Sequence, residues 1–148
     1  MVRISEATAA DVEAISEVLG EIEAYYGGEP VPGNPEQIRT ALFGDRPAAT
    51  VLLARDADDV LGLASYTLLW PAAGAETSLY LKELFVRSEA RRRGVARLLM
   101  EELKAAAVTA GCSRVEWTAD TDNPAALDFY KALGAQPRDG KVFYRAAL

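Results

Sequence analysis

The chain of 148 residues contains no histidine and a single cysteine, Cys112. Without histidine, the Ser-His-Asp and Cys-His arrangements of nucleophilic enzymes are excluded, together with the commonest general base. One cysteine excludes an intrachain disulfide, and it cannot form the usual set of zinc ligands. Any chemistry must therefore use carboxylates, tyrosines, lysines and backbone amides, and we expect no metal site.

Long apolar runs and a broad basic surface are also missing. No run approaches the length of a membrane span, and residues 1–6 lack the apolar segment of a signal peptide, so we expect a cytoplasmic protein and no membrane partner. The formal net charge is −6 and the sequence pI is about 4.7, which argues against nucleic acid as a partner. The length and the even spread of hydrophobic residues predict a single domain over residues 1–148.

The spacing of the apolar residues predicts alternating strands and helices. Strands are expected at residues 2–7, 50–55, 60–70, 78–86, 114–119 and 141–146. Helices are expected at residues 12–26, 35–43, 95–110 and 124–133. The order is β-α-α-β-β-β-α-β-α-β, which predicts an α/β fold on a mixed sheet, with strand 78–86 in a central position.

Three arginines, at positions 91–93, precede the helix expected at residues 95–110. A helix N-terminus carries partial positive charge and unpaired N–H groups, so cations are misplaced there unless an anion joins them. Phosphate groups are the usual anions at such sites. Gly94 allows the backbone to approach a ligand closely. A solvated basic helix start is the alternative, and the common nucleotide-binding motifs are absent.

Two segments resemble motifs of the GNAT family of N-acetyltransferases. The pattern Arg91-x-x-Gly94-x-Ala96 is similar to the family's pyrophosphate loop, Gln/Arg-x-x-Gly-x-Gly/Ala. Residues 123–135 are similar to its Asn-x-x-Ala-x-x-Phe-Tyr-x-x-x-Gly-Phe/Ala helix. The resemblance covers nearly the whole chain. It implies a GNAT fold: a mixed, mostly antiparallel central sheet flanked by about four helices, with a splayed pair of central strands.

The resemblance also implies acetyl-coenzyme A as co-substrate. Its pantetheine arm would pair with the backbone of residues 84–86, and its phosphates would lie against residues 92–97. Asn123 would bond the pantetheine or serve only as a helix N-cap, and the two roles are compatible. The predicted cofactor-binding residues are Leu84, Phe85, Val86, Arg91, Arg92, Arg93, Gly94, Val95, Ala96, Arg97, Asn123 and Tyr130.

Acetyl transfer to an amine needs a base for the amine and an acid for the leaving thiolate. The resemblance makes Tyr130 the acid, and an aromatic core residue is the alternative. Around Tyr80 the chain resembles the family members that acetylate polyamines and diamines, but Lys82 replaces their basic glutamate. Glu83 is then the best candidate base, because a carboxylate in an apolar strand is costly unless paired or functional. Pairing of Glu83 with an arginine and a buried Lys82 as base are the alternatives.

The implied function is transfer of an acetyl group from acetyl-coenzyme A to a primary amine of a small molecule. An acidic and aromatic mouth for the amine is expected from Glu21, Glu23, Tyr25, Tyr26, Glu29 and Trp70, although helix carboxylates are often only a solvated face. The alternatives are a non-catalytic coenzyme A-binding module and an enzyme that acetylates a protein lysine or N-terminus. Dimers are common in the family, so a homodimer is also expected. The identity of the acceptor amine stays open.

Overall fold

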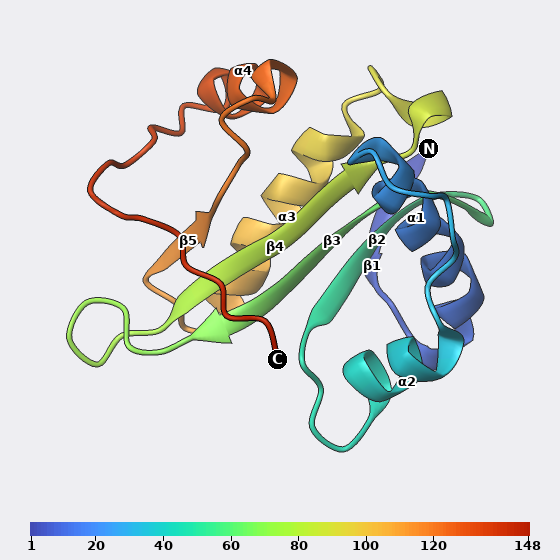
Figure 1. Ribbon diagram of the computed structural model, residues 1–148, viewed down its shortest axis with the longest axis horizontal. Helices are drawn as coiled ribbons and strands as arrows, with labels where there is room; N and C mark the ends of the chain where they lie inside the picture. Colours follow the sequence, from blue (N-terminus) through green and yellow to red (C-terminus); the bar gives the residue numbers. More distant parts are fainter. The chain divides into compact units, whose positions relative to one another are not determined.

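The computed structural model describes residues 1–148 as one five-stranded sheet with four α-helices (Figure 1). The strands are β1 (Val2–Glu6), β2 (Thr50–Asp56), β3 (Asp59–Leu69), β4 (Ser78–Val86) and β5 (Arg114–Trp117). The helices are α1 (Val12–Tyr25), α2 (Pro35–Phe43), α3 (Val95–Thr109) and α4 (Pro124–Ala132), and short 3₁₀ turns, η1 (Ala9–Asp11) and η2 (Ser88–Ala90), precede α1 and α3. The predicted α/β fold on a mixed sheet is confirmed. The chain divides into two compact units, Met1–Trp117 and Thr118–Leu148.

The strands lie in the order β1-β2-β3-β4-β5. All neighbours are antiparallel except β4 and β5, which are parallel because α3 carries the chain back to the same end of the sheet. The sheet is therefore mixed and mostly antiparallel, and β4 has a neighbour on each side, as predicted for a strand with few exposed positions.

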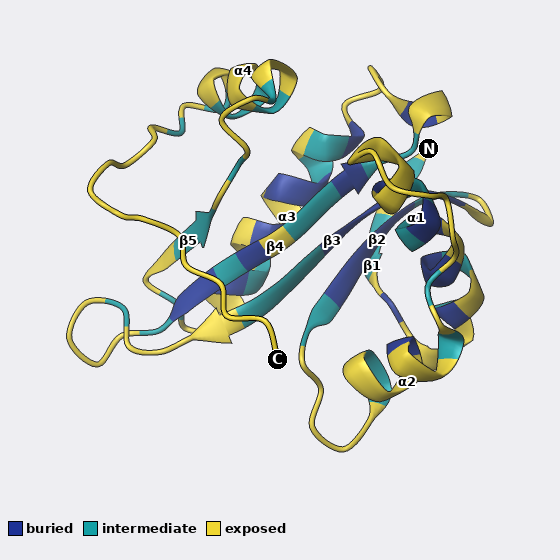
Figure 2. Ribbon diagram, in the orientation of Figure 1, coloured by how far each residue is buried: buried dark blue, intermediate teal, exposed yellow.

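The two faces of the sheet are covered by different helices. Residues of α1, α2 and the strands form one buried cluster, which includes Val18, Ile22, Leu53, Leu63 and Phe85. Helix α3 contacts β1 to β4 and buries residues that do not belong to this cluster, so it packs on the other face. Residues 51–54 of β2 and 60–64 of β3 are all buried, so these strands are covered on both faces (Figure 2).

The pairing of β4 with β5 is short. It runs from Ser78 opposite Arg114 to Leu81 opposite Trp117, whereas β4 continues to Val86 and stays paired with β3 on its other side. Residues 82–86 of β4 therefore have no strand neighbour on the β5 side. This divergence is the splayed pair that the GNAT fold implies, and it leaves an edge of β4 for another backbone-like group.

A β-bulge interrupts β4 at Lys82. Ser65 on β3 pairs with Glu83, whereas Tyr66 pairs with Leu81, so Lys82 is the extra residue. An extra residue re-aims the side chains around it, and strict alternation therefore does not assign opposite faces to Lys82 and Glu83.

The strand expected at residues 141–146 is not formed. In the second unit, α4 ends at Ala132. Gly134 then adopts φ 86°, as expected for a glycine after a helix, and no strand follows it. All side chains from Gln136 to Leu148 are exposed. A strand needs a partner edge for its backbone groups, and the apolar spacing of residues 142–144 does not supply one.

None of the helices combines the length and the apolar character needed to cross a membrane.

Candidate functional site

The turn between β4 and α3, residues 87–94, holds the anion site predicted from the sequence. Residues 91–97, where the donor phosphates are predicted to lie, are called the donor loop below. Gly94 precedes the first helical residue with φ 75° and ψ 14°, and Arg92 adopts φ 66°. The first turn of α3 has no acidic residue and no side-chain cap. Since the first N–H groups of a helix have no partner within it, this end carries unneutralised partial positive charge.

The arginines of the donor loop have different partners. Arg93 donates to Asp56 over 2.8 Å, and Arg91 donates from Nε to the Val86 carbonyl over 3.1 Å. Arg92 and Arg97 are exposed and form no ion pair. The sequence shows one basic cluster, whereas the structure leaves two of its cations available to a ligand.

Burial limits which atoms of the other predicted cofactor-binding residues can contact a ligand. Phe85 and Val95 are buried in the core, so only their backbone groups can meet a ligand. Leu84 and Val86 are half-buried and lie on the part of β4 that has no β5 neighbour. The predicted pairing of a cofactor arm with the backbone of residues 84–86 therefore fits this edge.

Arg87, which the sequence analysis did not single out, is the centre of an ion-pair cluster. Its guanidinium contacts Glu21 Oε2 at 2.6 Å, Glu17 Oε1 at 2.7 Å and Glu89 Oε1 at 3.5 Å. Burial alone would lower the pKa of Arg87, but the hydrogen bonds and charges of Glu21 and Glu17 outweigh it and raise that pKa. The sequence signal was two carboxylates one turn apart on α1 without a cation on the same helix.

The end of α1 contacts β4 through two tyrosines. Tyr26 donates its hydroxyl to Glu83 Oε2 over 3.3 Å. Tyr25 lies edge-on to Phe85, with ring centroids 5.8 Å apart, and the Arg91 guanidinium carbon is 5.4 Å from the Tyr25 ring centroid. Glu83, the predicted base, is half-buried, and its carboxylate has Tyr26, at the end of α1, as a neighbour.

Lys82 is exposed. The alternative in which Lys82 acts as a buried base required a buried side chain, so its premise is not met.

The structure changes the expected amine-binding mouth. Glu21 forms an ion pair with Arg87, and Arg91 lies over the ring of Tyr25, so both side chains already have a cationic partner. Trp70 is exposed and donates its indole N–H to the Ala75 carbonyl. Glu23 and Glu29 are exposed, and Tyr26 stands beside Glu83. The acidic and aromatic character remains, but it is carried by fewer residues than the sequence indicates.

Asn123 and Tyr130 belong to the second unit. The Asn123 side chain accepts from the Ala126 N–H over 3.2 Å, so its predicted role as N-cap of α4 is confirmed. Tyr130 is half-buried in α4, with its ring 5.3 Å from that of Phe129. A half-buried phenol has one part packed and another accessible, as a proton donor requires.

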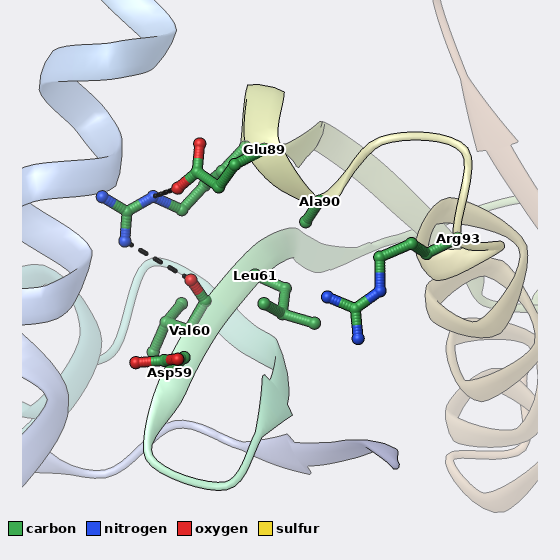
Figure 3. A pocket seen from close by; sticks show the side chains of 7 residues that line it. Asp59, Val60, Leu61, Glu89, Ala90 and Arg93 are labelled. Atoms are coloured by element: carbon green, nitrogen blue, oxygen red, sulfur yellow. Dashed lines mark hydrogen bonds and ion pairs between the residues drawn. The ribbon is translucent and has the colours of Figure 1, made fainter.

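A cavity of about 310 Å³ lies beside the donor loop (Figure 3). It is lined by Asp59, Val60, Leu61, Arg87, Glu89, Ala90 and Arg93. Only Arg93 belongs to the predicted cofactor residues, and its charge is directed to Asp56, whose pKa is lowered by the Arg93 hydrogen bond. The cavity is therefore separate from the open edge of β4.

The structure contains no group of three or more His, Cys, Asp or Glu residues that could hold a metal ion.

Comparison with known proteins gives a family match over most of the chain. Residues 17–135 match the Acetyltransferase (GNAT) family. Thialysine N-epsilon-acetyltransferase of Bos taurus is 27% identical over 144 residues, which cover 91% of this chain and 84% of that protein. L-ornithine N5-acetyltransferase of Arabidopsis thaliana is 34% identical over 77 residues, which cover 52% of this chain and 34% of that protein.

Solved structures share the fold. An integron cassette protein from the mobile metagenome of V. cholerae superimposes with a TM-score of 0.86 at 33% identity, covering 99% of this chain and 92% of that one. An aminoglycoside acetyltransferase from an uncultured soil metagenomic sample has a TM-score of 0.84 at 18% identity, covering 99% of this chain and 96% of that one. The second likeness concerns the fold alone.

Proposed function

The chain belongs to the acetyltransferase (GNAT) family of N-acetyltransferases, and we propose that it moves an acetyl group from acetyl-coenzyme A to a primary amine of a small molecule. The observation that carries the proposal is the start of α3. Gly94 in the left-handed region, a first turn without acid and two unpaired arginines form a site for a phosphate-bearing donor.

The donor is proposed to lie along residues 84–97. Its pantetheine arm pairs with β4 at residues 84–86, where β5 has diverged. Its pyrophosphate accepts from the backbone amides of Gly94, Val95 and Ala96, and Arg92 and Arg97 add charge. Residues 17–135 match the family and include parts of both compact units, which supports one catalytic domain over residues 1–148.

The proposed reaction is a direct transfer. Glu83, directly or through a water, accepts a proton from the ammonium form of the acceptor, and the free amine nitrogen attacks the thioester carbonyl carbon. The new C–N bond forms as the C–S bond breaks, and the departing sulfur takes a proton from Tyr130. The second proton of the attacking nitrogen passes to the tyrosinate, which leaves a neutral amide, and Glu83 returns its proton to solvent. The phenol suits this step because its usual pKa, about 10, is close to that of a thiol.

The proposed acceptor is an amine of amino-acid size. The relatives are named for the acetylation of ornithine and of thialysine, which are small molecules with a side-chain amine. Glu23, Glu29 and Glu83 supply negative charge near the end of α1, which favours a cationic acceptor over a neutral one.

The test is coenzyme A titration followed by thiol release from acetyl-coenzyme A with a panel of small diamines, amino acids and lysine peptides. We expect binding, and turnover that is fastest with a small diamine or basic amino acid. Tyr130→Phe should lower kcat by about 100-fold, whereas Tyr144→Phe, at an exposed tyrosine, should not change it. Coenzyme A binding without turnover on any amine contradicts the proposal, and faster turnover of the peptides contradicts the small-molecule acceptor.

A further inference from the structure

One face of α1 contacts the chain on both sides of η2. Glu17, Glu21 and Tyr25 follow each other at intervals of four residues and so share this face. Their partners, Arg87 and Arg91, are also four residues apart and enclose η2. The helix therefore holds both ends of the short segment that joins β4 to the donor loop.

The first contact is a two-pronged ion pair. Arg87 donates from Nε to Glu21 Oε1 over 3.2 Å, and its Nη2 is 2.6 Å from Glu21 Oε2. The side chain of Arg87 is 17% exposed and that of Glu21 33%, so water screens this pair less than it screens Glu17, which is 65% exposed. Arg87 is also fixed by its own N–H, which donates to the Leu61 carbonyl. Bidentate geometry fixes direction as well as distance.

The second contact is a cation stacked against aromatic rings. The Arg91 guanidinium carbon lies 5.4 Å from the Tyr25 centroid and 5.7 Å from the Phe85 centroid. Its Nε donates to the Val86 carbonyl, which ties the first residue of the donor loop to the end of β4. Because Phe85 is buried in the core, this stack has a rigid base.

We propose that Glu21 and Tyr25 are positioning residues for the acetyl donor, acting through Arg87 and Arg91. The inference rests on the proposed function, in which the donor occupies residues 84–97. Backbone amides bind an anion only when they point at it, so the position of the loop sets the affinity of the site. Neither residue touches the donor in this proposal; each fixes one end of the segment that carries the binding groups.

The test compares matched variants in coenzyme A titrations on the full chain. Glu21→Gln keeps the shape of the side chain and removes its charge, and it should weaken coenzyme A binding by about fivefold. Glu13→Gln removes an exposed carboxylate from the first turn of the same helix and should leave binding unchanged. Tyr25→Leu should weaken binding by about threefold, whereas Tyr25→Phe, which keeps the ring, should bind like the unmodified protein.

Kinetics separate positioning from general loss of structure. The KM for acetyl-coenzyme A should rise in Glu21→Gln and Tyr25→Leu, while the KM for the amine stays constant and kcat recovers at saturating donor. A merely destabilised enzyme would lose kcat at every donor concentration. In an Arg87→Met background, Glu21→Gln should have no further effect on coenzyme A affinity, because its partner is gone.

Two outcomes overturn the inference. One is unmodified affinity in Glu21→Gln and Tyr25→Leu, and the other is additive losses in the Glu21→Gln, Arg87→Met double variant. Both require that the unmodified protein binds coenzyme A. If that protein itself fails to bind, the proposed function fails instead, so the two failures are distinguishable.

Discussion

Arg91 lies over the ring of Tyr25, with its guanidinium carbon 5.4 Å from the ring centroid. This contact joins the first cation of the donor loop to the last residue of α1. Arg93 is held by Asp56, so the three consecutive arginines have three different environments. Only Arg92 of the three is exposed without a partner, and its backbone is in the left-handed region.

Arg92→Gly should stabilise the protein and weaken donor binding. Arg92 adopts φ 66°, which costs a non-glycine residue about 1 kcal/mol, and glycine removes this strain. The same change removes a cation from the proposed phosphate site. We expect a higher Tm by thermal denaturation and a several-fold rise in the Kd for coenzyme A. Arg92→Lys, which keeps the charge and the strained backbone, is the control. A lower Tm in Arg92→Gly than in the unmodified protein would contradict the claim that Arg92 is strained.

Tyr26→Phe should lower turnover through Glu83. The Tyr26 hydroxyl donates to Glu83 Oε2 over 3.3 Å, and losing it removes one contact that orients the carboxylate proposed to act as the base. We expect kcat/KM for the amine to fall by about three- to tenfold, with an unchanged Kd for coenzyme A. Glu83→Gln alone should cost about 100-fold. In the Glu83→Gln background Tyr26→Phe should add nothing, so an additive loss would argue against this link.

Gly62→Ala should destabilise the sheet where β3 pairs with β4, beside the proposed donor site. A Cβ at Gly62 would stand 2.5 Å from the Phe85 carbonyl oxygen and 3.1 Å from Val86 Cα, so backbone must move. We expect a loss of about 1–3 kcal/mol in the free energy of unfolding, measured in urea. Thr67→Ala, in the same strand, should change stability by less than about 1 kcal/mol. Equal stability of Gly62→Ala and the unmodified protein would show that β4 has room to shift.

Asp11→Asn should destabilise the protein at neutral pH and not in acid. Arg55 Nη2 is 2.8 Å from Asp11 Oδ1, and the Thr8 N–H donates to the other carboxylate oxygen. Burial alone would raise the pKa of Asp11, but these hydrogen bonds outweigh it and lower that pKa below its ordinary value. The carboxylate therefore stabilises the fold above about pH 4, and this contribution is lost as the pH falls through the folded-state pKa.

The measurement for Asp11 is urea denaturation across pH. We expect Asp11→Asn to cost about 1–3 kcal/mol at pH 7 and the difference to shrink as the pH falls below about 4. Asp58→Asn, in the exposed turn between β2 and β3, is the control. A difference that persists unchanged in acid would assign the effect to packing of the amide rather than to charge.

The sequence by itself determined the elements and their types, because periodicity and caps are local properties. The strand at residues 78–86 and the helix from Pro35 to Phe43, capped by Asn34, match the structure within a residue. Two short motifs, at residues 91–96 and 123–135, also predicted the family, and the family match over residues 17–135 confirms it. The strand expected at residues 141–146 is absent. Apolar spacing shows that a segment could form a strand, but it does not show that a neighbouring strand is there to pair with it.

Only the tertiary structure decided which partner each charged side chain contacts. The sequence does not distinguish the three arginines at positions 91–93. In the structure, Arg91 lies over the ring of Tyr25 and Arg93 donates to Asp56, both far away along the chain. Glu21, which the sequence placed in the amine-binding mouth, forms an ion pair with Arg87 instead. The bulge at Lys82 follows from the register with β3. These contacts join residues that are distant in the sequence. They depend on how α1 packs against the sheet and on how the strands pair, which local patterns do not specify.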